Sequence, residues 1–237
     1  MLYTKQAVQD NIRNREGRRV FYLGKGDQLT SDAREFLTRE RIEILPASQA
    51  KPVRWQLLGG GFCEEKPEHM THLNAQVLVR KDHPRIRFRG MIDLLEAELL
   101  LCMKNCPAVR AQLGEILDFV RELIRCDVLE ETLRQDQLCG LTMEQLRSRS
   151  HRPQDYYGQP HFMPSAADAP ELLMVNRARC VARRAELAAV EAFSDREGNP
   201  TRMDILQAMN RVSSMLYLLM IGIKAGNEPA CKDQKFS

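Results

Sequence analysis

Arginine and glutamate side chains recur at helical spacing within the segment RARCVARRAEL. Arg179, Arg183 and Glu186 stand at positions i, i+4 and i+7, so they share one face if the segment is a helix. Two guanidinium groups on one face can hold a polyphosphate through forked hydrogen bonds. A solvated basic face with a local arginine–glutamate pair has the same spacing, so the pattern alone leaves both alternatives open.

Small polar side chains mark one face of a second segment, MNRVSSMLY. Asn210, Ser213, Ser214 and Tyr217 fall on the same side of a helix, with Arg211 beside them. Such groups on an otherwise apolar helix are typical of a wet pocket or of a polar contact between helices. The outer surface of a helical bundle is the alternative.

One carboxylate lies within an apolar run. Asp93 is flanked by Met91, Ile92, Leu94 and Leu95. If the carboxylate is buried, it needs a cationic partner. The arginine-rich segment is the expected source, within one chain or across a subunit interface. An ordinary exposed carboxylate is the alternative.

Metal ligands and catalytic motifs are poorly represented. Cys63, His69 and His72 are spaced as C-x5-H-x2-H, and three nitrogen or sulfur ligands can hold zinc or iron. This spacing matches no common metal motif, so we expect no metal site, and a metal-binding or redox protein is a weakly supported alternative. The chain shows no Ser–His–Asp pattern, dinucleotide-binding fingerprint or Walker motif.

Composition excludes several classes of protein. Lys and Arg number 35 and Asp and Glu number 32, and a net charge of +3 gives no support for a general nucleic-acid binder or membrane-surface binder. Seven cysteines at irregular spacing do not resemble a disulfide framework and suit a reducing cytosol. We expect neither a membrane span nor a signal peptide, because no apolar run is long enough and the first residues are polar.

Apolar residues recur at intervals of three and four in four long segments, which predicts four amphipathic helices. Together with modest connections they predict a helical bundle. A shorter helix is predicted from Thr142, followed by a stiff loop, HRPQDYYGQPHFMP, with three prolines. The four long helices are predicted from Pro84 to Cys102, from Pro107 to Ile124, from Ala166 to Phe193, and from a cap at Thr201 to Ile223.

The rest of the chain divides by composition. Residues 1–45 are predicted as a small strand–helix–strand unit, whose helix begins at a capping box formed by Asp32 and Glu35. Proline and glycine then indicate a linker. The predicted divisions after the first unit are a linker at 46–65, the helical bundle at 66–226 and a tail at 227–237.

Taken in order, these segments resemble one known family. The chain contains KPEHMTHLNAQVLVRKDHPRIRFRGMIDLLEA, FMPSAADAP, RARCVARRAEL and DILQAMNRVSSMLYLLM. RARCVARRAEL is similar to the R-x-V-x-R-R-A-E-R segment of ATP:cob(I)alamin adenosyltransferases, and MNRVSSMLY to their L-N-R-L-S-D-x-L-F segment. The segment around Asp93 is similar to their T-V-D-E-L-N segment. The resemblance is particularly to the ethanolamine-utilisation type; it spans residues 66–224 and extends more weakly to the N-terminal unit.

The resemblance implies a mainly α fold of four to five long helices, assembled as a homotrimer with active sites between subunits. It implies an enzyme that transfers the 5′-deoxyadenosyl group of ATP, bound with Mg²⁺, to the cobalt of cob(I)alamin. The product would serve a B12-dependent ammonia-lyase of ethanolamine utilisation, and a reductase is a second implied partner. The implied location is the cytoplasm, where a bacterial microcompartment is a more specific alternative.

The resemblance also implies roles for individual residues. Arg183, Arg184 and Glu186 match the family's ATP-binding stretch, in which the arginines suit phosphates and the carboxylate suits Mg²⁺ or polar nucleotide groups. Asn210 matches a nucleotide-contacting asparagine, and Lys81 matches a lysine that contacts phosphate.

Other matches concern cobalamin and the subunit boundary. Phe162 matches an aromatic residue at the lower face of cobalamin, although from sequence alone a core plug is the commoner role of such a ring. Asp93 and Arg179 match a charged pair across the subunit interface. The implied catalytic group is therefore Phe162, Arg183 and Asn210.

Several departures from the family pattern limit the transfer of roles. The glycine-rich nucleotide loop of related branches is replaced by KPEHMTHL, in which Lys66, Thr71 and His72 are the candidate substitutes. No C-C-x-x-C metal motif is present, and Ser214 replaces an aspartate. A non-catalytic cobalamin carrier or microcompartment interaction protein of the same lineage is the alternative function.

Overall fold

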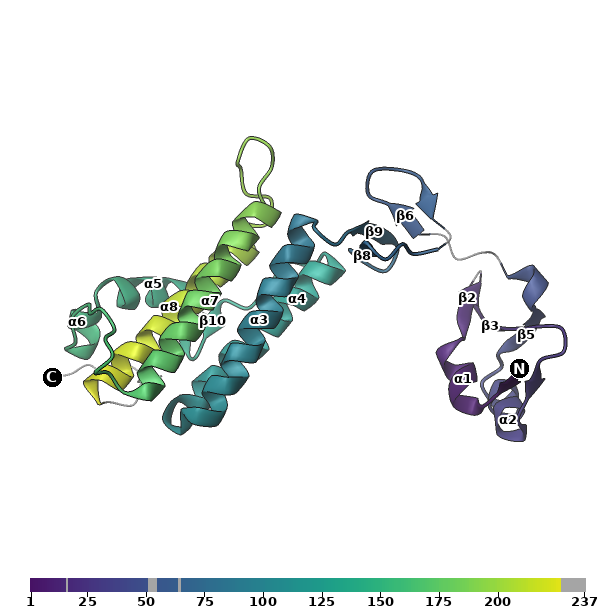
Figure 1. Ribbon diagram of the computed structural model, residues 1–237, viewed down its shortest axis with the longest axis horizontal. Helices are drawn as coiled ribbons and strands as arrows, with labels where there is room; N and C mark the ends of the chain where they lie inside the picture. The colour runs from purple at the N-terminus through teal and green to yellow at the C-terminus, as the bar shows by residue number, and fades with distance from the viewer. Residues whose placement is uncertain (16, 51–54, 64, 227–237) are drawn as a thin grey trace. The chain divides into compact units, whose positions relative to one another are not determined.

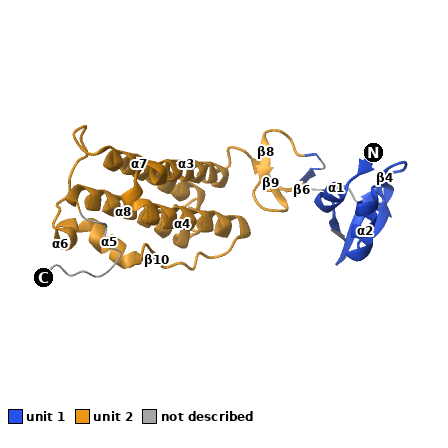
Figure 2. Cartoon of the chain, turned by 90° about the horizontal axis from the view of Figure 1, so that it is seen from below, with its two compact units in different colours: residues 1–55, 62–65 blue, residues 56–61, 66–237 orange. Residues whose placement is uncertain are grey.

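The computed structural model describes residues 1–15, 17–50, 55–63 and 65–226. The chain forms two compact units (Figure 2), one of Met1–Trp55 and Phe62–Glu65, the other of Gln56–Gly61 and Lys66–Ser237. The predicted tail at 227–237, and residues 51–54 and 64 of the predicted linker, lie outside the described residues. The predicted domain boundaries therefore stay predictions.

The first unit contains a three-stranded sheet in the order β2-β3-β5, in which β3 pairs antiparallel with β2 and parallel with β5. Its core includes Phe21 and Leu37. The unit's elements are β1 (Leu2–Tyr3), α1 (Lys5–Asp10), β2 (Arg13–Arg15), β3 (Arg18–Leu23), β4 (Gln28–Leu29), α2 (Ser31–Arg39), β5 (Glu43–Pro46), the 3-10 turn η1 (Ala47–Gln49) and β7 (Phe62–Cys63).

The capping box predicted for the helix of this unit is wrong. The cap of α2 is Thr30, whose side-chain oxygen accepts a hydrogen bond from the Ala33 amide at 3.3 Å. Asp32 instead lies in the first turn, where a carboxylate favours the positive end of the helix dipole.

A small sheet precedes the helices of the second unit. Strand β6 (Trp55–Leu57) pairs in parallel with β9 (Val77–Arg80), and β8 (Met70–His72) pairs with β9 in antiparallel fashion. The segment 46–65 was predicted as an irregular linker, yet residues 55–57 and 62–63 are strands. Pairing with a distant strand stabilises β6, which propensity over three residues cannot indicate.

Four long helices form the bundle and lie side by side (Figure 1), which confirms the predicted mainly α fold. Helix α7 packs against both α3 and α8, and α3 also packs against α4. None of the described helices is long and apolar enough to cross a lipid bilayer. The four helices are α3 (Pro84–Asn105), α4 (Arg110–Leu129, after the 3-10 turn η2 at Pro107–Val109), α7 (Pro170–Ala192) and α8 (Met203–Ala225).

Shorter elements cover one side of α8. The hairpin β10 (Gln137–Leu138) and β11 (Leu141–Thr142) leads into α5 (Met143–His151), which begins at Thr142 as predicted. Thr142 and Gln145 form a capping box there. The segment predicted as a proline-stiffened loop contains a short helix, α6 (Pro153–Tyr157), because proline suits a first helical turn.

The predicted cap of the last helix is also wrong. Helix α8 begins after Arg202, and no side chain caps it. Asp204, three residues after Thr201, accepts hydrogen bonds from the Leu133 amide and from Arg202.

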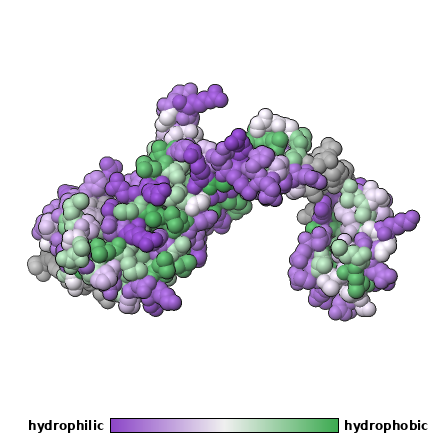
Figure 3. Space-filling view, viewed as in Figure 1, coloured by the Kyte–Doolittle hydropathy of each residue, from purple (hydrophilic) through white to green (hydrophobic). Residues whose placement is uncertain are grey.

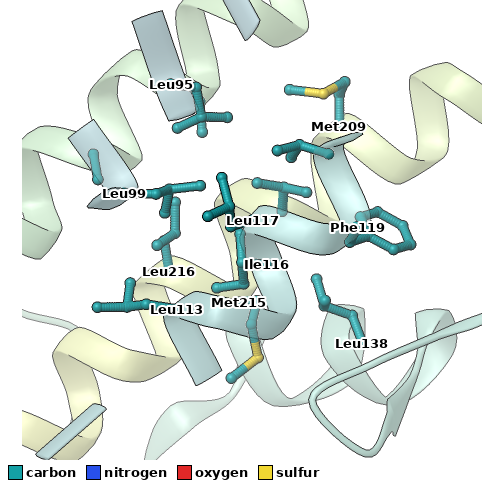
Figure 4. Packing of buried hydrophobic residues seen from close by; sticks show 14 of the residues in the cluster. Leu95, Leu99, Leu113, Ile116, Leu117, Phe119, Leu138, Met209, Met215 and Leu216 are labelled. Carbon is teal, nitrogen blue, oxygen red and sulfur yellow. The ribbon is translucent and has the colours of Figure 1, made fainter. Parts of the chain in front are cut away.

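The bundle core is continuous between α3, α4 and α8 (Figure 4), where Leu95 and Leu99 of α3 meet Ile116 of α4 and Leu216 of α8. Helix α7 contributes alanines instead of large side chains. The buried set on that helix includes Ala178, Ala182, Ala185 and Ala189, each with no exposed surface. Small side chains allow neighbouring helices to approach closely, so this face of α7 fixes its register against α3 and α8.

A buried carboxylate joins the beginning of α3 to the end of α4. Asp127 is fully buried and accepts hydrogen bonds from Arg85 Nε at 2.9 Å and from Arg89 Nε at 2.7 Å. Arg89 also donates to the carbonyl oxygen of Leu73, at 2.8 Å, which ties the small sheet to the helices. Two arginines therefore share one buried carboxylate, and Arg85 also lies 3.6 Å from the exposed Glu130 carboxylate.

Replacing Asp127 with alanine is expected to destabilise the fold by about 3–5 kcal/mol, because Arg89 loses its anionic partner and Arg85 keeps only the exposed Glu130, at 3.6 Å. Chemical denaturation of the variant measures this change in the free energy of unfolding. Asp118→Ala is the control, because this exposed carboxylate lies on the same helix; its change is expected to stay within about 0.5 kcal/mol. Equal stability of the two variants would contradict the role of Asp127.

Candidate ligand-binding cleft

A cleft of about 420 Å³ lies where α5, α7, α8 and the segment after α6 meet. The arginine and glutamate face predicted on α7 and the polar face predicted on α8 both open into it. The sequence therefore predicted both faces, and the fold brings them together. The cleft is lined by Ser150, His151, His161, Arg179, Arg183, Glu186, Asn210, Ser213, Ser214 and Tyr217.

Hydrogen bonds fix the orientation of Asn210. Its side-chain nitrogen donates to Glu186 Oε1 at 2.7 Å, and its side-chain oxygen accepts from Arg211. The hydroxyls of Ser213 and Ser214 donate to the backbone carbonyl of Asn210 at 3.0 and 3.1 Å. The amide and the carboxylate are thus held as one polar group in the cleft.

The arginines of the cleft lack carboxylate partners among the described residues. Arg179 donates from Nε and from a terminal nitrogen to the amide oxygen of Asn176, at 3.2 and 3.0 Å. Arg183 is exposed, and no hydrogen bond or ion pair holds it within the described part of the chain. The only carboxylate in the lining, Glu186, already accepts from Asn210. The cleft therefore offers guanidinium groups to an anion.

A histidine connects the cleft to the segment that carries Phe162. His161 Nε2 lies 3.1 Å from the carbonyl oxygen of His151, and Nδ1 lies 2.8 Å from the Tyr217 hydroxyl. A carbonyl oxygen only accepts, so Nε2 donates to it; in the tautomer with the proton on Nε2, Nδ1 accepts from the Tyr217 hydroxyl. Sequence analysis did not single out His161, because lone histidines beside loops are usually caps.

Tyr217 also holds Phe162 directly. The tyrosine oxygen accepts a hydrogen bond from the Phe162 backbone amide, and burial raises the pKa of Tyr217, which keeps its hydroxyl protonated and able to donate. The two rings stack with centroids 6.4 Å apart, and the Lys224 ammonium lies 5.5 Å from the Phe162 centroid. Phe162 is half-buried against the bundle core and does not itself line the cleft.

Several predicted site residues lie elsewhere in the chain. Lys66 and Lys81 are exposed, Thr71 lies in β8, and none of the three lines the cleft. Arg184 is exposed on α7 outside the cleft lining. Asp93 is exposed on α3 and makes no recorded contact with Arg179 among the described residues. Within one chain, therefore, the cleft contains only some of the site residues predicted from the sequence.

Metal-ligand geometry is not found in the described ranges. No group of three His, Cys, Asp or Glu side chains within them is close enough to hold a metal ion. The Cys63 thiol lies against the carbonyl oxygen of Glu65.

Replacing Tyr217 with phenylalanine is expected to loosen the Phe162 segment, because His161 and the Phe162 amide each lose a hydrogen-bond partner. One hydrogen bond contributes a net stability of about 0.5–1.5 kcal/mol. Its loss predicts about two- to tenfold faster hydrogen–deuterium exchange at the Phe162 amide. Tyr156→Phe is the control, since the Tyr156 hydroxyl bonds to Ser148 outside the cleft. Unchanged exchange in Tyr217→Phe would refute the restraint.

Comparison with known proteins relates this geometry to one family. Residues 62–223 match the family model described as cobalamin adenosyltransferase. A protein of Escherichia coli K12 named corrinoid adenosyltransferase EutT is 33% identical over 158 residues, which are 66% of this chain and 59% of that protein. A protein of the same name from Salmonella typhimurium is 32% identical over 242 residues, covering 92% of this chain and 90% of that protein. The chain thus spans well under two thirds of the E. coli relative.

Proposed function

Because this chain belongs to the cobalamin adenosyltransferase family, as its sequence motifs predicted, we propose that it transfers the 5′-deoxyadenosyl group of ATP to the cobalt of cob(I)alamin. The observation that carries the proposal is the cleft, which brings together Arg183, Glu186 and Asn210 from the two segments that resemble the family's nucleotide-binding motifs. Arg179 adds a second guanidinium to the same cavity.

The chemistry of this transfer matches what the cleft offers. In the proposed reaction the reduced cobalt attacks the ribose 5′ carbon, the carbon–oxygen bond to the triphosphate breaks, and the electron pair leaves with the triphosphate. No proton is removed from a nucleophile, so no general base is needed. The protein has to position the substrates and neutralise the leaving polyphosphate, which is a task for guanidinium groups.

Individual roles follow from the positions of the residues. Arg183 is free to bind phosphate, and Asn210 presents its amide to the nucleotide from a fixed orientation. The carboxylate of Glu186 suits Mg²⁺ that enters with ATP, or a polar group of the nucleotide. Arg184 does not line the cleft and is proposed to bind ATP together with Lys81.

Lys66, Thr71 and Lys81 lie in or beside the small sheet and do not line the cleft of their own chain. We propose that they reach the nucleotide from a neighbouring subunit. An active site between subunits would explain why one chain gathers only part of the set.

Phe162 is proposed to occupy the lower face of cobalamin. Its backbone is fixed through Tyr217, and its neighbour His161 lines the cleft. A ring held there would displace the lower cobalt ligand and ease reduction to the nucleophilic state. The partial burial of Phe162 is equally compatible with a core plug, so the assignment depends on the family resemblance.

An exposed apolar surface on α3 and α7 supports a homotrimer (Figure 3). Large apolar residues are exposed there, and patches of this kind mark protein–protein contacts. Leu187 follows Arg183 by one helical turn, so a subunit packed on this surface would border the cleft. Asp93 lies beside Leu94 on α3 and is proposed to pair with Arg179 of another copy. The surface comprises Leu94, Leu100, Leu101, Leu187 and Val190.

The proposed product, adenosylcobalamin, would serve a B12-dependent ammonia-lyase of ethanolamine utilisation, with a reductase supplying the reduced corrinoid. Both partners, and a location in the cytoplasm or a microcompartment, rest on the resemblance. A non-catalytic cobalamin carrier is the second candidate. The polyphosphate-type lining disfavours it, since a carrier needs no site for ATP.

Purified protein given ATP, Mg²⁺ and chemically reduced cobalamin under anaerobic conditions is expected to form adenosylcobalamin, which its visible spectrum identifies. Arg183→Ala is expected to lose about ten- to a hundredfold in kcat/KM, because a charge-assisted hydrogen bond contributes about 1.5–3 kcal/mol. Arg196→Ala, an exposed arginine outside the cleft, is the control. No product from folded protein would reject the enzyme; normal kinetics of Arg183→Ala would reject the phosphate role.

Replacing Leu187 with aspartate is expected to dissociate the trimer without unfolding the subunit. Its side chain is 70% exposed in the single chain, so only a contact with another copy would bury it. Sedimentation would then show the mass fall to one third. Leu129→Asp, at a leucine 53% exposed on α4, is the control. A wild-type monomer, or an intact trimer of Leu187→Asp, would contradict this interface.

A further inference from the structure

A second cavity of about 620 Å³ lies between α5 and α8, beside the cleft. Its lining combines three arginines, Arg147, Arg152 and Arg211, with a single carboxylate, Glu144. His151 lines both cavities, and Arg211 bonds to Asn210 of the cleft. The two cavities are therefore neighbours that share a wall.

Arg211 is a nine-tenths buried guanidinium whose recorded partners are neutral. Its Nε donates to the carbonyl oxygen of Met143 at 2.8 Å, and one terminal nitrogen donates to the amide oxygen of Asn210. A guanidinium has five N–H donors, so donors remain for a ligand in the cavity it lines. No carboxylate forms an ion pair with Arg211 among the described residues.

The other arginines add positive charge at the same place. Burial and then the nearby Arg147 lower the pKa of Arg211, while Glu186 acts in the opposite direction. Arg147 is exposed and has no recorded partner in the described chain, and Arg152 donates only to the Ser148 hydroxyl, at 3.2 Å. An unneutralised cluster of guanidiniums around a cavity favours a phosphate group, which accepts forked hydrogen bonds.

We propose that the cavity between α5 and α8 is a second anion site, which binds a phosphate group of one of the two substrates. The inference rests on the proposed function. Two sources share this chemistry. One is the phosphodiester in the nucleotide tail of cobalamin, which would leave the cobalt if Phe162 takes the lower face. The other is the triphosphate chain of ATP, extended past Asn210.

Kinetics of Arg147→Ala and Arg152→Ala test the site, since both side chains are exposed and their loss should not disturb folding. Each variant is assayed with cobalamin and with cobinamide, which lacks the nucleotide tail. A tail site predicts a KM for cobalamin raised about tenfold and an unchanged KM for cobinamide. A triphosphate site predicts a KM for ATP raised about tenfold with either corrinoid.

Two further measurements make the result specific. Arg147→Lys keeps the charge and should recover part of the affinity, and Arg196→Ala should match wild type. The second site would be overturned if both alanine variants kept KM values within about twofold of wild type for all substrates. Loss of one guanidinium–phosphate contact is expected to change KM by more than about twofold.

Failure of the proposed function has a different signature. Wild-type protein would then be inactive with both corrinoids. Calorimetry with inorganic triphosphate would in that case test whether the cavity binds an anion. Weaker binding by Arg147→Ala and Arg152→Ala than by Arg196→Ala would support the anion site. Equal binding by the three variants would overturn it.

Discussion

The close packing of the alanine face of α7 is the constraint on which the rest of the structure depends. Ala178, Ala182, Ala185 and Ala189 are fully buried, and they set the register of α7 against α3 and α8. The neighbouring face of the same helix then carries Arg179, Arg183 and Glu186 to the polar face of α8. A large side chain in place of any of these alanines would separate the helices, and the bond between Asn210 and Glu186 would lengthen with them.

Several arginines of the bundle have carboxylate partners, and those at the two cavities have none among the described residues. Arg85 and Arg89 share the buried Asp127, and Arg177 bonds to Glu98, so these positive charges are neutralised within the fold. The arginines at the two cavities bond to neutral oxygens or to nothing recorded in the described chain. Of these arginines, Arg211 is buried. Because burying an unpaired charge is costly, an anionic ligand in its cavity would stabilise it.

Periodicity predicted the long helices and both faces of the cleft, because a spacing of three to four places residues on one side of a helix whatever surrounds it. It could not predict the pairing of Arg89 with Asp127, which lie 38 residues apart on different helices. Nor could it predict that α8 has no side-chain cap, because Asp204 bonds to the distant Leu133 amide. Helix α6 was not predicted, because its proline indicated a stiff loop, whereas proline also suits the first turn of a helix. Strand β6 needed its partner β9 to be recognised.

The segment between α6 and α7 links these features into one functional arrangement. His161 bonds to the end of α5 and to α8, and Tyr217 passes this restraint to the Phe162 backbone. The residue that His161 holds on α5, His151, stands between the two cavities. A substrate that spans both cavities would therefore contact the same hydrogen-bonded chain that positions the Phe162 ring. One hydrogen-bonded chain through His151, His161 and Tyr217 therefore joins the wall between the two cavities to the Phe162 backbone.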